Sequence, residues 1–465
     1  MTEAVRVETD SLGTIDVPAD ALWGAQTERA RHNFEISGTP VSRFPAMIVA
    51  LAMTKQAAAR VNARIGHLSA DKADAIEAVT AEIIGGAHHD AFPIDAIQGG
   101  AGTSLNMNMN EVVANLANLR LGGELGTYDR IHPNDDVNRS QSTNDVYPTA
   151  MRLSLVLAQH SLSTALTGLA DAFDERGEAF ADIVKLGRTQ LQDAVPMTLG
   201  QEFSAFATVL REDVSRLSEI TPLLLEVNLG GTAIGTRLNA PRGYAPEAVA
   251  ELAGISGEKL VLASNLVEAS WDMGGFVLFS AMLKRTATKL SKIANDLRLL
   301  SSGPRGGIGE ILLPEMQPGS SIMPGKVNPV IPEVVNQVCF QVIGNDLAVT
   351  LAAEAGQLQL NAMEPLIAYN LHSSLQLMER ATVTLTELCV RGIRADADRC
   401  REHLDASVGI VTALVPVIGY AESARLAKDA LKLGRKVAEL AVERGLIDET
   451  QAADLLDPAK LARPQ

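Results

Sequence analysis

Large apolar residues recur every seven positions between about residues 266 and 301. They are Phe276, Leu283, Leu290 and Leu297, with Phe279 and Ile293 beside them. This spacing places the side chains on one narrow seam of a single long helix. Ser302, Gly303 and Pro304 come next and predict the end of that helix. Such a seam has to be buried against neighbouring helices.

Two further segments show the same helical spacing. Thr198 to Gln201 has the pattern of a capping box, and the apolar residues Phe203, Phe206, Leu210, Val214 and Leu217 follow it at helical intervals. A third helix is expected after Pro148, with an apolar stripe formed by Leu155, Leu162, Leu166, Leu169 and Phe173. Aromatic residues make up only 4% of the chain, which also favours helices over sheets. We therefore predict a mainly α protein with a central bundle of long helices.

Changes in pattern along the chain suggest three domains. Residues 1–141 form a mixed, mostly helical N-terminal domain, and residues 142–396 form the bundle. Residues 397–465 have a higher charge density and short helices broken by Pro416 and Gly419, which indicates a small helical C-terminal domain. No internal repeat or low-complexity tract divides the chain further.

Composition excludes several classes of protein. Of the 465 residues, 46% are hydrophobic, which is enough for a large core, and the net charge of −16 argues against binding nucleic acid or an anionic membrane. The three cysteines are scattered and lack metal-site spacing, so neither a disulfide framework nor a zinc site is expected. We expect no signal peptide, no stretch of membrane-spanning length and a cytoplasmic location.

Residues 319–329 form the most informative loop of the chain. They read Gly-Ser-Ser-Ile-Met-Pro-Gly-Lys-Val-Asn-Pro. Two prolines and two glycines forbid a regular helix there, and Ser320, Ser321, Lys326 and Asn328 supply two hydroxyls, one ammonium and one amide. A loop with these groups is suited to holding an anion, whereas the plainer interpretation is a surface linker.

Three other clusters are also rich in small hydroxyls and amides rather than in His, Cys or paired carboxylates. They lie at residues 102–106, 140–145 and 187–193 and contain Thr103, Ser142, Thr143, Asn144, Thr189 and Gln190. A carboxylate accepts about four hydrogen bonds, so such groups can bind it with few positive charges. Each cluster alone is as readily explained as a turn or a helix cap, and this holds especially for Ser142 to Asn144. Four together favour a carboxylate-binding site.

These motifs give the chain a resemblance to the fumarase/aspartase superfamily that runs almost end to end. The matching stretches are residues 10–13, 17–20, 23–27, 102–106, 132–145 and 319–329. Residues 187–197, 332–340 and 353–361 are similar to the aspartase branch in particular. The resemblance implies a three-domain fold whose bundle assembles into a tetramer core. The implied reaction is the reversible elimination of ammonia from L-aspartate to give fumarate, without a cofactor.

The resemblance also implies a role for each candidate residue. Ser320 is the base that removes a proton from the β-carbon, which produces an enediolate with two negative charges on the β-carboxylate. That group is held by Thr103, Ser142, Thr143 and Ser321. Thr189, Lys326 and Asn328 hold the α-carboxylate, and Asn144 and Gln190 lie near the amino group.

Two positions depart from the family pattern. Fumarases and some aspartases have a histidine where this chain has Gln190. A departing hydroxyl needs a proton donor, whereas a substrate ammonium already carries its proton, so glutamine suits ammonia better. Arg237 stands where relatives usually carry glycine.

The order of the clusters along the chain predicts an oligomer. Residues 142–144 precede a helix of roughly 30 residues and Thr189 follows it, which separates the two clusters by about 45 Å at 1.5 Å per residue. An antiparallel neighbour would bring the opposite helix end to the same ligand. We therefore expect a symmetric oligomer, and the resemblance implies a homotetramer with sites built from three subunits.

Three alternatives remain open at this level. The first is a class II fumarate hydratase that interconverts malate and fumarate. A lyase for larger succinyl substrates fits the motifs outside the shared loop poorly. A catalytically silent structural protein is disfavoured by the intact Ser320, Lys326, Asn328 and Thr189. We expect no metal ion in the site. The sequence does not show whether a divalent cation activates the protein.

Overall fold

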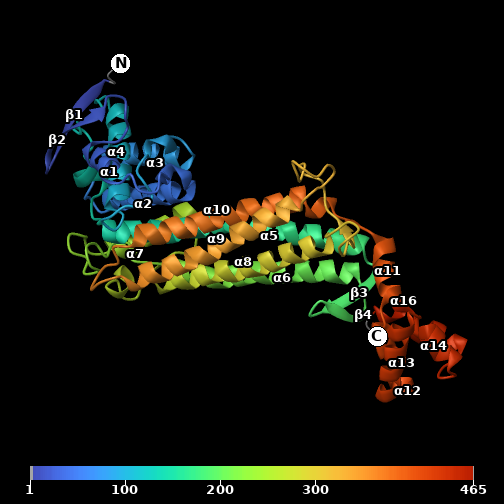
Figure 1. The fold of residues 1–465 in the computed structure, drawn as a ribbon. Coiled ribbons are helices and arrows are strands. Elements are labelled where there is room, and N and C mark those ends of the chain that lie inside the picture. Colours follow the sequence, from blue (N-terminus) through green and yellow to red (C-terminus); the bar gives the residue numbers. More distant parts are fainter. Residues whose placement is uncertain (1–3, 464–465) are drawn as a thin grey trace. The chain divides into compact units, whose positions relative to one another are not determined.

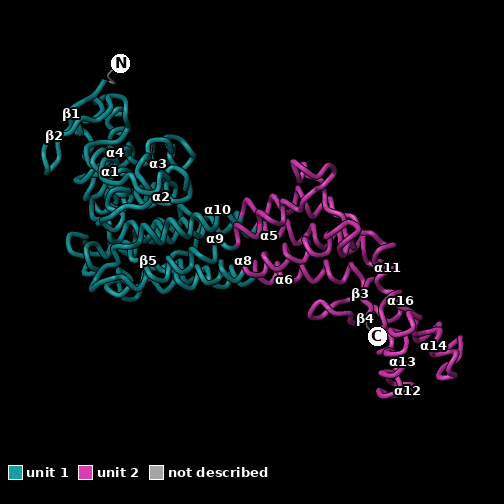
Figure 2. The backbone as a smooth tube through the Cα atoms, viewed as in Figure 1, with its two compact units in different colours: residues 1–163, 215–285, 340–378 teal, residues 164–214, 286–339, 379–465 magenta. Residues whose placement is uncertain are grey.

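The computed structural model describes residues 4–463, and helices dominate it (Figure 1). The chain forms two compact units, which Figure 2 distinguishes by colour. Unit 1 consists of residues 1–163, 215–285 and 340–378, and unit 2 consists of residues 164–214, 286–339 and 379–465. The mainly α fold predicted from the sequence is confirmed, while the division into three domains stays a prediction.

Five long helices contribute residues to both units. They are α5 (Thr143–Ala179), α6 (Leu199–Ile220), α8 (Gly274–Leu300), α9 (Val330–Glu354) and α10 (Glu364–Leu388). The seven-residue seam of α8 is buried as predicted, because none of its six apolar side chains is more than 1% exposed. The helix begins at Gly274 rather than near residue 266, since the Asp272 carboxylate accepts a hydrogen bond from the Gly274 amide and ends the preceding turn.

The remaining elements of unit 1 surround its share of the long helices. They are β1 (Val5–Asp10), β2 (Gly13–Pro18), α1 (Ala25–Asn33), α2 (Pro45–Arg64), α3 (Ala70–Ile84), α4 (Thr103–Arg120), β5 (Glu226–Val227), α7 (Tyr244–Ser256) and β6 (Val261–Leu262). β1 and β2 form an antiparallel hairpin, and β5 pairs with β6 in parallel. The alanine-rich helix α2 packs against both α3 and α7, because its small side chains let neighbouring helices approach closely.

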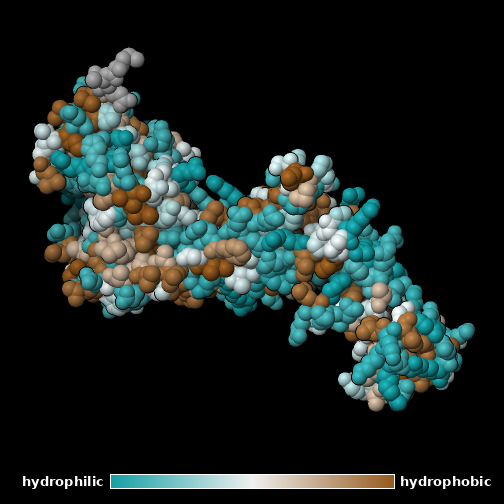
Figure 3. Space-filling view, in the orientation of Figure 1, coloured by the Kyte–Doolittle hydropathy of each residue, from teal (hydrophilic) through white to brown (hydrophobic). Residues whose placement is uncertain are grey.

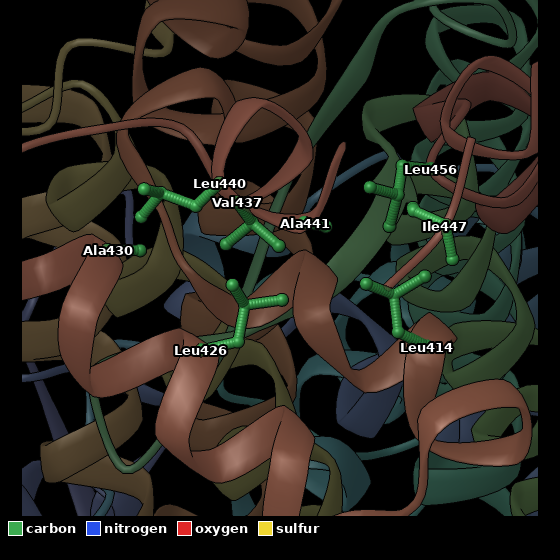
Figure 4. Close-up of a cluster of buried hydrophobic side chains, with 8 residues drawn as sticks. All are labelled: Leu414, Leu426, Ala430, Val437, Leu440, Ala441, Ile447 and Leu456. Atoms are coloured by element: carbon green, nitrogen blue, oxygen red, sulfur yellow. The ribbon is translucent and has the colours of Figure 1, made fainter. Parts of the chain in front are cut away.

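Unit 2 adds two antiparallel strand pairs and the C-terminal helices. Its elements are β3 (Val184–Thr189), β4 (Gln192–Thr198), β7 (Ile311–Leu312), β8 (Arg394–Ala395), α11 (Ala397–Ala406), α12 (Val415–Ile418), α13 (Tyr420–Leu433), α14 (Val437–Glu443), α15 (Glu449–Leu455) and α16 (Pro458–Leu461). β3 pairs with β4 and β7 pairs with β8. The C-terminal helices share a small apolar core around Leu414, Leu426 and Leu440 (Figure 4).

The capping box predicted at residues 198–201 is present at the start of α6. The Gln201 amide donates to Thr198 Oγ1 at 3.1 Å, and the Thr198 amide donates to Gln201 Oε1 at 2.9 Å. The aromatic stripe that follows packs edge to face against α5 in unit 2, where Phe173 lies 5.8 Å from Phe203 and 5.4 Å from Phe206 between ring centroids.

The prediction that the third helix starts after Pro148 is wrong by five residues. α5 begins at Thr143 and contains Pro148. A proline has no N–H, so it leaves the carbonyl oxygen four residues earlier without its helical partner. That oxygen belongs to Asn144, and it accepts a hydrogen bond from the side-chain amide of Asn228 at 3.0 Å. The helix therefore passes through Pro148 without an unpaired carbonyl.

One side of α9 exposes large apolar side chains. Phe340, Ile343, Leu347 and Leu351 are 61%, 37%, 62% and 60% exposed, and their spacing of three and four residues places them on one stripe within unit 1. Figure 3 likewise shows hydrophobic side chains at the surface along the long helices of unit 1. The expectation that no segment has membrane-spanning length is wrong for α9, whose length and apolar composition suffice, although one such helix is weak evidence for a membrane span.

Helix α1 is capped by a side chain that is distant in sequence. Glu111 of α4 accepts hydrogen bonds from the backbone amides of Gly24, Gln26 and Thr27 at 2.8–3.1 Å and from Thr27 Oγ1 at 2.6 Å. These are the amides that a helix start leaves without partners. Gly24 is required here, because a Cβ at this position would lie 2.2 Å from the Tyr128 hydroxyl. Glu8 accepts the remaining amide, that of Ala25, at 3.0 Å, so two buried carboxylates fix the start of α1 and Glu111 makes most of the bonds.

Glu111→Gln should lower the free energy of unfolding by about 2–3 kcal/mol. The amide keeps one oxygen but turns an NH2 group towards donors that need an acceptor. Urea unfolding at fixed protein concentration measures the change, with Glu124→Gln at an exposed position of the same unit as the control. Equal unfolding midpoints for the two variants would show that the four hydrogen bonds do not hold α1.

Candidate active site

Ser142, Thr143 and Asn144 lie at the start of α5, in unit 1. Ser142 Oγ accepts a hydrogen bond from the Asn144 amide at 3.2 Å, and the Ser142 amide donates to Asp145 Oδ1 at 2.9 Å. The plain interpretation of this cluster as a helix cap is thus correct for Ser142. It does not conflict with ligand binding, because an oxygen that accepts an N–H keeps its own proton free to donate.

Asp145 joins this segment to a second loop of unit 1. Its carboxylate is fully buried, and Oδ2 accepts hydrogen bonds from the amides of Gly230 and Thr232 at 2.9 and 3.0 Å. Burial raises the pKa of Asp145 to about 6, while the three amide donors oppose that shift. The Asn144 side-chain amide also donates to the carbonyl oxygen of Ala233 at 2.8 Å. One carboxylate therefore fixes two loops in a single arrangement.

Arg237 lies in the same loop and has a φ of 62°. This left-handed conformation is one that glycine adopts without cost, so the glycine expected from the family pattern would fit at this position. The arginine keeps the loop closed through its own amide, which donates to the carbonyl oxygen of Gly231 at 3.0 Å. Its side chain is exposed.

A buried lysine lies beneath the start of α5. Lys55 of α2 is fully buried and donates hydrogen bonds to three amide oxygens, those of Asn106 (2.7 Å), Asn138 (3.0 Å) and Gln141 (2.9 Å). Asn106 in turn donates from Nδ2 to Thr143 Oγ1 at 3.1 Å. Since Thr143 Oγ1 accepts this bond, the hydroxyl proton of Thr143 is left to donate to a ligand.

Thr103 belongs to the same region of unit 1. It is the first residue of α4, and Asn106 lies one turn further along that helix. The preceding Gly102 contacts α5 so closely that a Cβ there would lie 2.2 Å from the Tyr147 ring. The Thr103 side chain is exposed and donates to the carbonyl oxygen of Gly100 at 2.8 Å. The structure thus brings α4 and α5 together at the ends that carry Thr103 and Thr143.

Thr189 and Gln190 lie at the tip of the β3–β4 hairpin, in unit 2. Thr189 pairs with Gln192, so Gln190 and Leu191 form a two-residue turn in which both have positive φ, 54° and 61°. Turns of this kind normally use asparagine and glycine, so the tip is strained. Thr189 and Gln190 are both exposed. The tip of the hairpin therefore exposes Thr189 and Gln190 at a turn whose backbone conformation is energetically unfavourable for residues other than glycine.

Ser320 lies in the loop that precedes α9, also in unit 2. Its Oγ accepts hydrogen bonds from the amides of Ile322 and Met323 at 3.2 and 2.9 Å. Ser320 and Lys326 both line an open cavity of about 490 Å³. Among residues 4–463 no acidic side chain forms an ion pair with Lys326. Two N–H donors and a nearby cation are the groups that stabilise a serine anion.

Asn328 closes the same loop. Its Nδ2 donates to the carbonyl oxygen of Gly319 at 2.8 Å, and the Gly319 amide donates to the carbonyl oxygen of Lys326 at 2.7 Å. A Cβ at Gly319 would lie 2.6 Å from that oxygen, so glycine is required. Ser321 and Lys326 are exposed around this closure. Asn328 thus has a structural role in addition to the one that the resemblance implies.

The candidate residues fall into three groups. Thr103 and residues 142–144 belong to unit 1, whereas the hairpin tip and the Ser320 loop belong to unit 2. Figure 1 shows the β3–β4 hairpin and the loop before α9 projecting from different sides of the helices of unit 2. Within one chain, unit 2 therefore does not bring Thr189 to Ser320. Among the described residues no group of three or more His, Cys, Asp or Glu side chains is arranged to hold a metal ion.

Sequence reasoning missed Lys55 and Asp145. A lysine within the apolar stretch of α2, residues 45–61, was a signal that could have been used, because a buried lysine needs partners. Asp145 directly follows the motif residues. Nothing in the sequence showed that the backbone amides of Gly230 and Thr232 would donate hydrogen bonds to it.

Comparisons with known proteins agree with this fold and these motifs. A family model described as "Lyase" matches residues 13–344, and one described as "Fumarase C C-terminus" matches residues 410–463. Aspartate ammonia-lyase of Pseudomonas aeruginosa is 60% identical over 461 residues, which cover 99% of this chain and 97% of that protein.

Two solved structures are similar over almost the whole chain. Fumarate lyase:delta crystallin from Brucella melitensis bound to cobalt has a TM-score of 0.96 and 58% identity, covering 99% of this chain and all of the other. A recombinant class II fumarase from Schistosoma mansoni has a TM-score of 0.93 and 36% identity over the same shares. The fold and the motifs together define a lyase. The chain belongs to the fumarase/aspartase family.

The buried lysine predicts a measurable pH dependence of stability. Burial lowers the pKa of Lys55 to about 7, against the opposing charge of Asp145. Between pH 7 and about 10.5 the unfolded chain binds more protons at this residue than the folded chain does, so its contribution to the free energy of unfolding rises with pH. The rise relative to Lys55→Met should be about 1 kcal/mol per pH unit.

Urea unfolding of wild type and Lys55→Met at pH 7, 8 and 9 tests this, with Lys259→Met at an exposed position as the control. A constant difference between wild type and Lys55→Met across this range would mean that Lys55 keeps an ordinary pKa in the fold.

Proposed function

We propose that this chain catalyses the reversible elimination of ammonia from L-aspartate to give fumarate. The observation that carries the proposal is the full-length identity of 60% to an aspartate ammonia-lyase, against 36% to a class II fumarase of the same fold. The hydroxyl and amide groups described above are suited to a small dicarboxylate. The reaction uses protein groups alone and no cofactor.

Ser320 acts as the base. The pKa of a serine hydroxyl is so high that almost none of it is deprotonated at neutral pH. It can act as a base only if nearby groups stabilise its anion. The amides of Ile322 and Met323 already point at Ser320 Oγ, and the positive charge of Lys326 belongs to the same cavity. These preorganised donors favour the anion without any rearrangement during the reaction. No histidine or carboxylate lies among the side chains of residues 319–329 to take this role, although Glu315, outside this loop motif, lines the same cavity.

The proton abstraction places a second negative charge on the β-carboxylate, and hydroxyl donors meet it. Ser142 and Thr143 each accept an N–H from the protein, so each can direct its O–H proton at the substrate. Ser321 completes this set, and Thr103 joins it when its hydroxyl turns from the carbonyl oxygen of Gly100 to the substrate. Donors aimed at charge that develops in the transition state contribute to the rate rather than only to binding.

The other end of the substrate is held by the remaining groups. Thr189, Lys326 and Asn328 bind the α-carboxylate, and Asn328 keeps one N–H for this after closing the loop. Asn144 and Gln190 lie near the amino group. Glutamine cannot donate a catalytic proton at neutral pH, which is adequate because the leaving group departs as ammonia.

The active form is a homotetramer in which each site combines residues of three subunits. α5 is one continuous helix of 37 residues, so at 1.5 Å per residue its two ends lie about 55 Å apart. Residues 142–144 lie at the start of this span and the β3–β4 hairpin follows it. A second copy of the chain, running antiparallel, brings its own β3–β4 hairpin to residues 142–144 of the first copy.

The apolar stripe on α9 is the surface that such copies would bury. Four large side chains between Phe340 and Leu351 are exposed by a third or more, an arrangement that monomeric proteins avoid. Burying them between copies also explains why α9 is apolar enough to resemble a membrane span. The three cysteines are free and buried, which is consistent with the cytoplasmic location that we propose.

Purified protein should convert L-aspartate to fumarate and ammonia, followed as a rise in ultraviolet absorbance. Ser320→Ala should lower turnover by about 10² to 10⁴-fold, because it removes the base, while leaving assembly and ligand binding intact. Ser256→Ala, at the end of α7, is the matched control.

The competing activities give different results in the same assay. Fumarate produced from malate but not from aspartate would establish a hydratase instead. Inertness towards both would indicate a catalytically silent protein. A Ser320→Ala variant that retains most of its turnover would require another base.

Phe340→Glu combined with Leu347→Glu should dissociate the oligomer and abolish turnover of aspartate. Burying two carboxylates in an apolar interface costs more than the contacts contribute. Sedimentation velocity and the absorbance assay measure both effects on one preparation. Leu431→Glu, at a leucine of α13 that is 71% exposed, is the control. A wild-type monomer with full activity would contradict the shared site.

A further inference from the structure

Glu310 is a fully buried carboxylate in unit 2 that three cationic or potentially cationic side chains surround. Lys185 Nζ lies 3.0 Å from its Oε2, and Arg188 Nη2 lies 2.8 Å from its Oε1. His403 Nδ1 of α11 lies 2.9 Å from the same Oε1. Burial alone would raise the pKa of Glu310, but these partners outweigh it and hold the pKa below its ordinary value.

Lys185 and Arg188 reach one carboxylate because β3 is irregular between them. Side chains three residues apart in a regular strand point to opposite faces. The pairing of β3 with β4 shifts register between Leu186 and Arg188, and such a bulge redirects the side chains that follow it. Gly187 permits this, since a Cβ there would lie 2.9 Å from the carbonyl oxygen of Val195. Thr189 follows directly, so the bulge also sets its direction.

The backbone of Glu310 is fixed as firmly as its side chain. Its amide donates to the carbonyl oxygen of Leu300 at 2.9 Å, and its carbonyl oxygen accepts from the Asp396 amide at 3.0 Å. The next two residues form β7, which pairs with β8. Beyond them, Pro314 packs so tightly against Gly392 that a Cβ on the glycine would lie 2.5 Å from its ring. Glu310 therefore stands at the root of the loop that carries Ser320.

One residue thus holds both substrate-contacting segments of unit 2. The β3–β4 hairpin is tied to Glu310 through two side chains of β3, and the Ser320 loop is tied to it through the chain itself. The hairpin tip depends on such a tie, because Gln190 and Leu191 occupy a strained turn and their side chains are exposed. The backbone pairing of Thr189 with Gln192 holds the two strands together, but it is internal to the hairpin.

We propose that Glu310 is a positioning residue, which aligns Thr189 and Gln190 on one side and the root of the Ser320 loop on the other. It touches no substrate. The proposal rests on the proposed function for the roles of Thr189 and Ser320, but its structural part concerns the hairpin and the loop alone. Displacement of reacting groups by about 1 Å lowers rates by about 10²-fold, which sets the expected effect.

The test compares Glu310→Gln with wild type. Glutamine has nearly the same shape, but it removes the buried counter-charge of Arg188 and leaves Lys185 with Glu202 alone, at 2.6 Å, so the base of the hairpin should shift. We expect kcat/KM for L-aspartate to fall by about 10²-fold, with a higher KM from the misplaced Thr189 and a lower kcat from the misplaced Ser320. Glu310→Asp keeps the negative charge, so it should restore part of the lost kcat and part of the change in KM.

Hydrogen exchange followed by mass spectrometry gives a readout that does not need turnover. Amides in residues 184–198 and 308–314 should exchange at least about tenfold faster in Glu310→Gln, whereas those of α6 and α8 should be unchanged. A merely structural role would speed exchange throughout unit 2.

Asp213→Asn is the matched control. Asp213 is a second fully buried carboxylate of unit 2, paired with Lys289 at 2.8 Å on the long helices. It should lose stability without losing kcat/KM. The proposal is overturned if Glu310→Gln stays within threefold of wild type in kcat/KM, or if its loss is matched by Asp213→Asn. If wild type itself fails to turn over aspartate, the proposed function fails, and the exchange pattern still decides the role of Glu310.

Discussion

A long uninterrupted helix is the constraint on which the rest of this molecule depends. α5 carries the Ser142 to Asn144 cluster at its first residues and leads to the β3–β4 hairpin beyond its last. A helix is stiff, so this chain cannot fold its two clusters onto one small ligand. That stiffness is the reason why we propose that sites are shared between copies, which would bury the exposed apolar stripe on α9. Even Pro148 does not interrupt α5, because Asn228 supplies the missing donor.

The proposed substrate is a dianion, whereas the protein itself has a net charge of −16. Lys55 and Lys185 are buried, and their charges are balanced by amide oxygens or carboxylates. Only Lys326 is exposed on a candidate segment without an ion-pair partner in the part of the chain that the structure describes. Most of the binding must therefore come from neutral O–H and N–H groups. These groups bind a ligand only when their protons point towards it. The N–H groups that donate to the hydroxyl oxygens of Thr143 and Ser142 orient those hydroxyls.

The sequence predicted those features that depend on local pattern. The seam of α8 and the capping box of α6 were predictable because apolar spacing and cap residues act within a few turns. The loop around Ser320 was predictable because prolines and glycines leave few conformations open. The β3–β4 hairpin was not, since its strained tip has neither asparagine nor glycine. The side-chain contacts that Lys55, Asp145 and Glu310 make with other elements join residues more than 50 positions apart, and a single sequence does not reveal which distant residues will meet.

The partners of Glu310 also bear on how the protein matures. Its carbonyl oxygen is bonded by Asp396 and its carboxylate by His403, while the strand that it anchors was made some 200 residues earlier. A ribosome therefore releases the hairpin long before the residues that complete its support emerge. Until α11 has been translated and docked, β7 lacks β8 and the buried carboxylate lacks one of its partners. The supports of the hairpin and of the Ser320 loop in unit 2 are thus completed late in synthesis, so a nascent chain lacks them until α11 has been made.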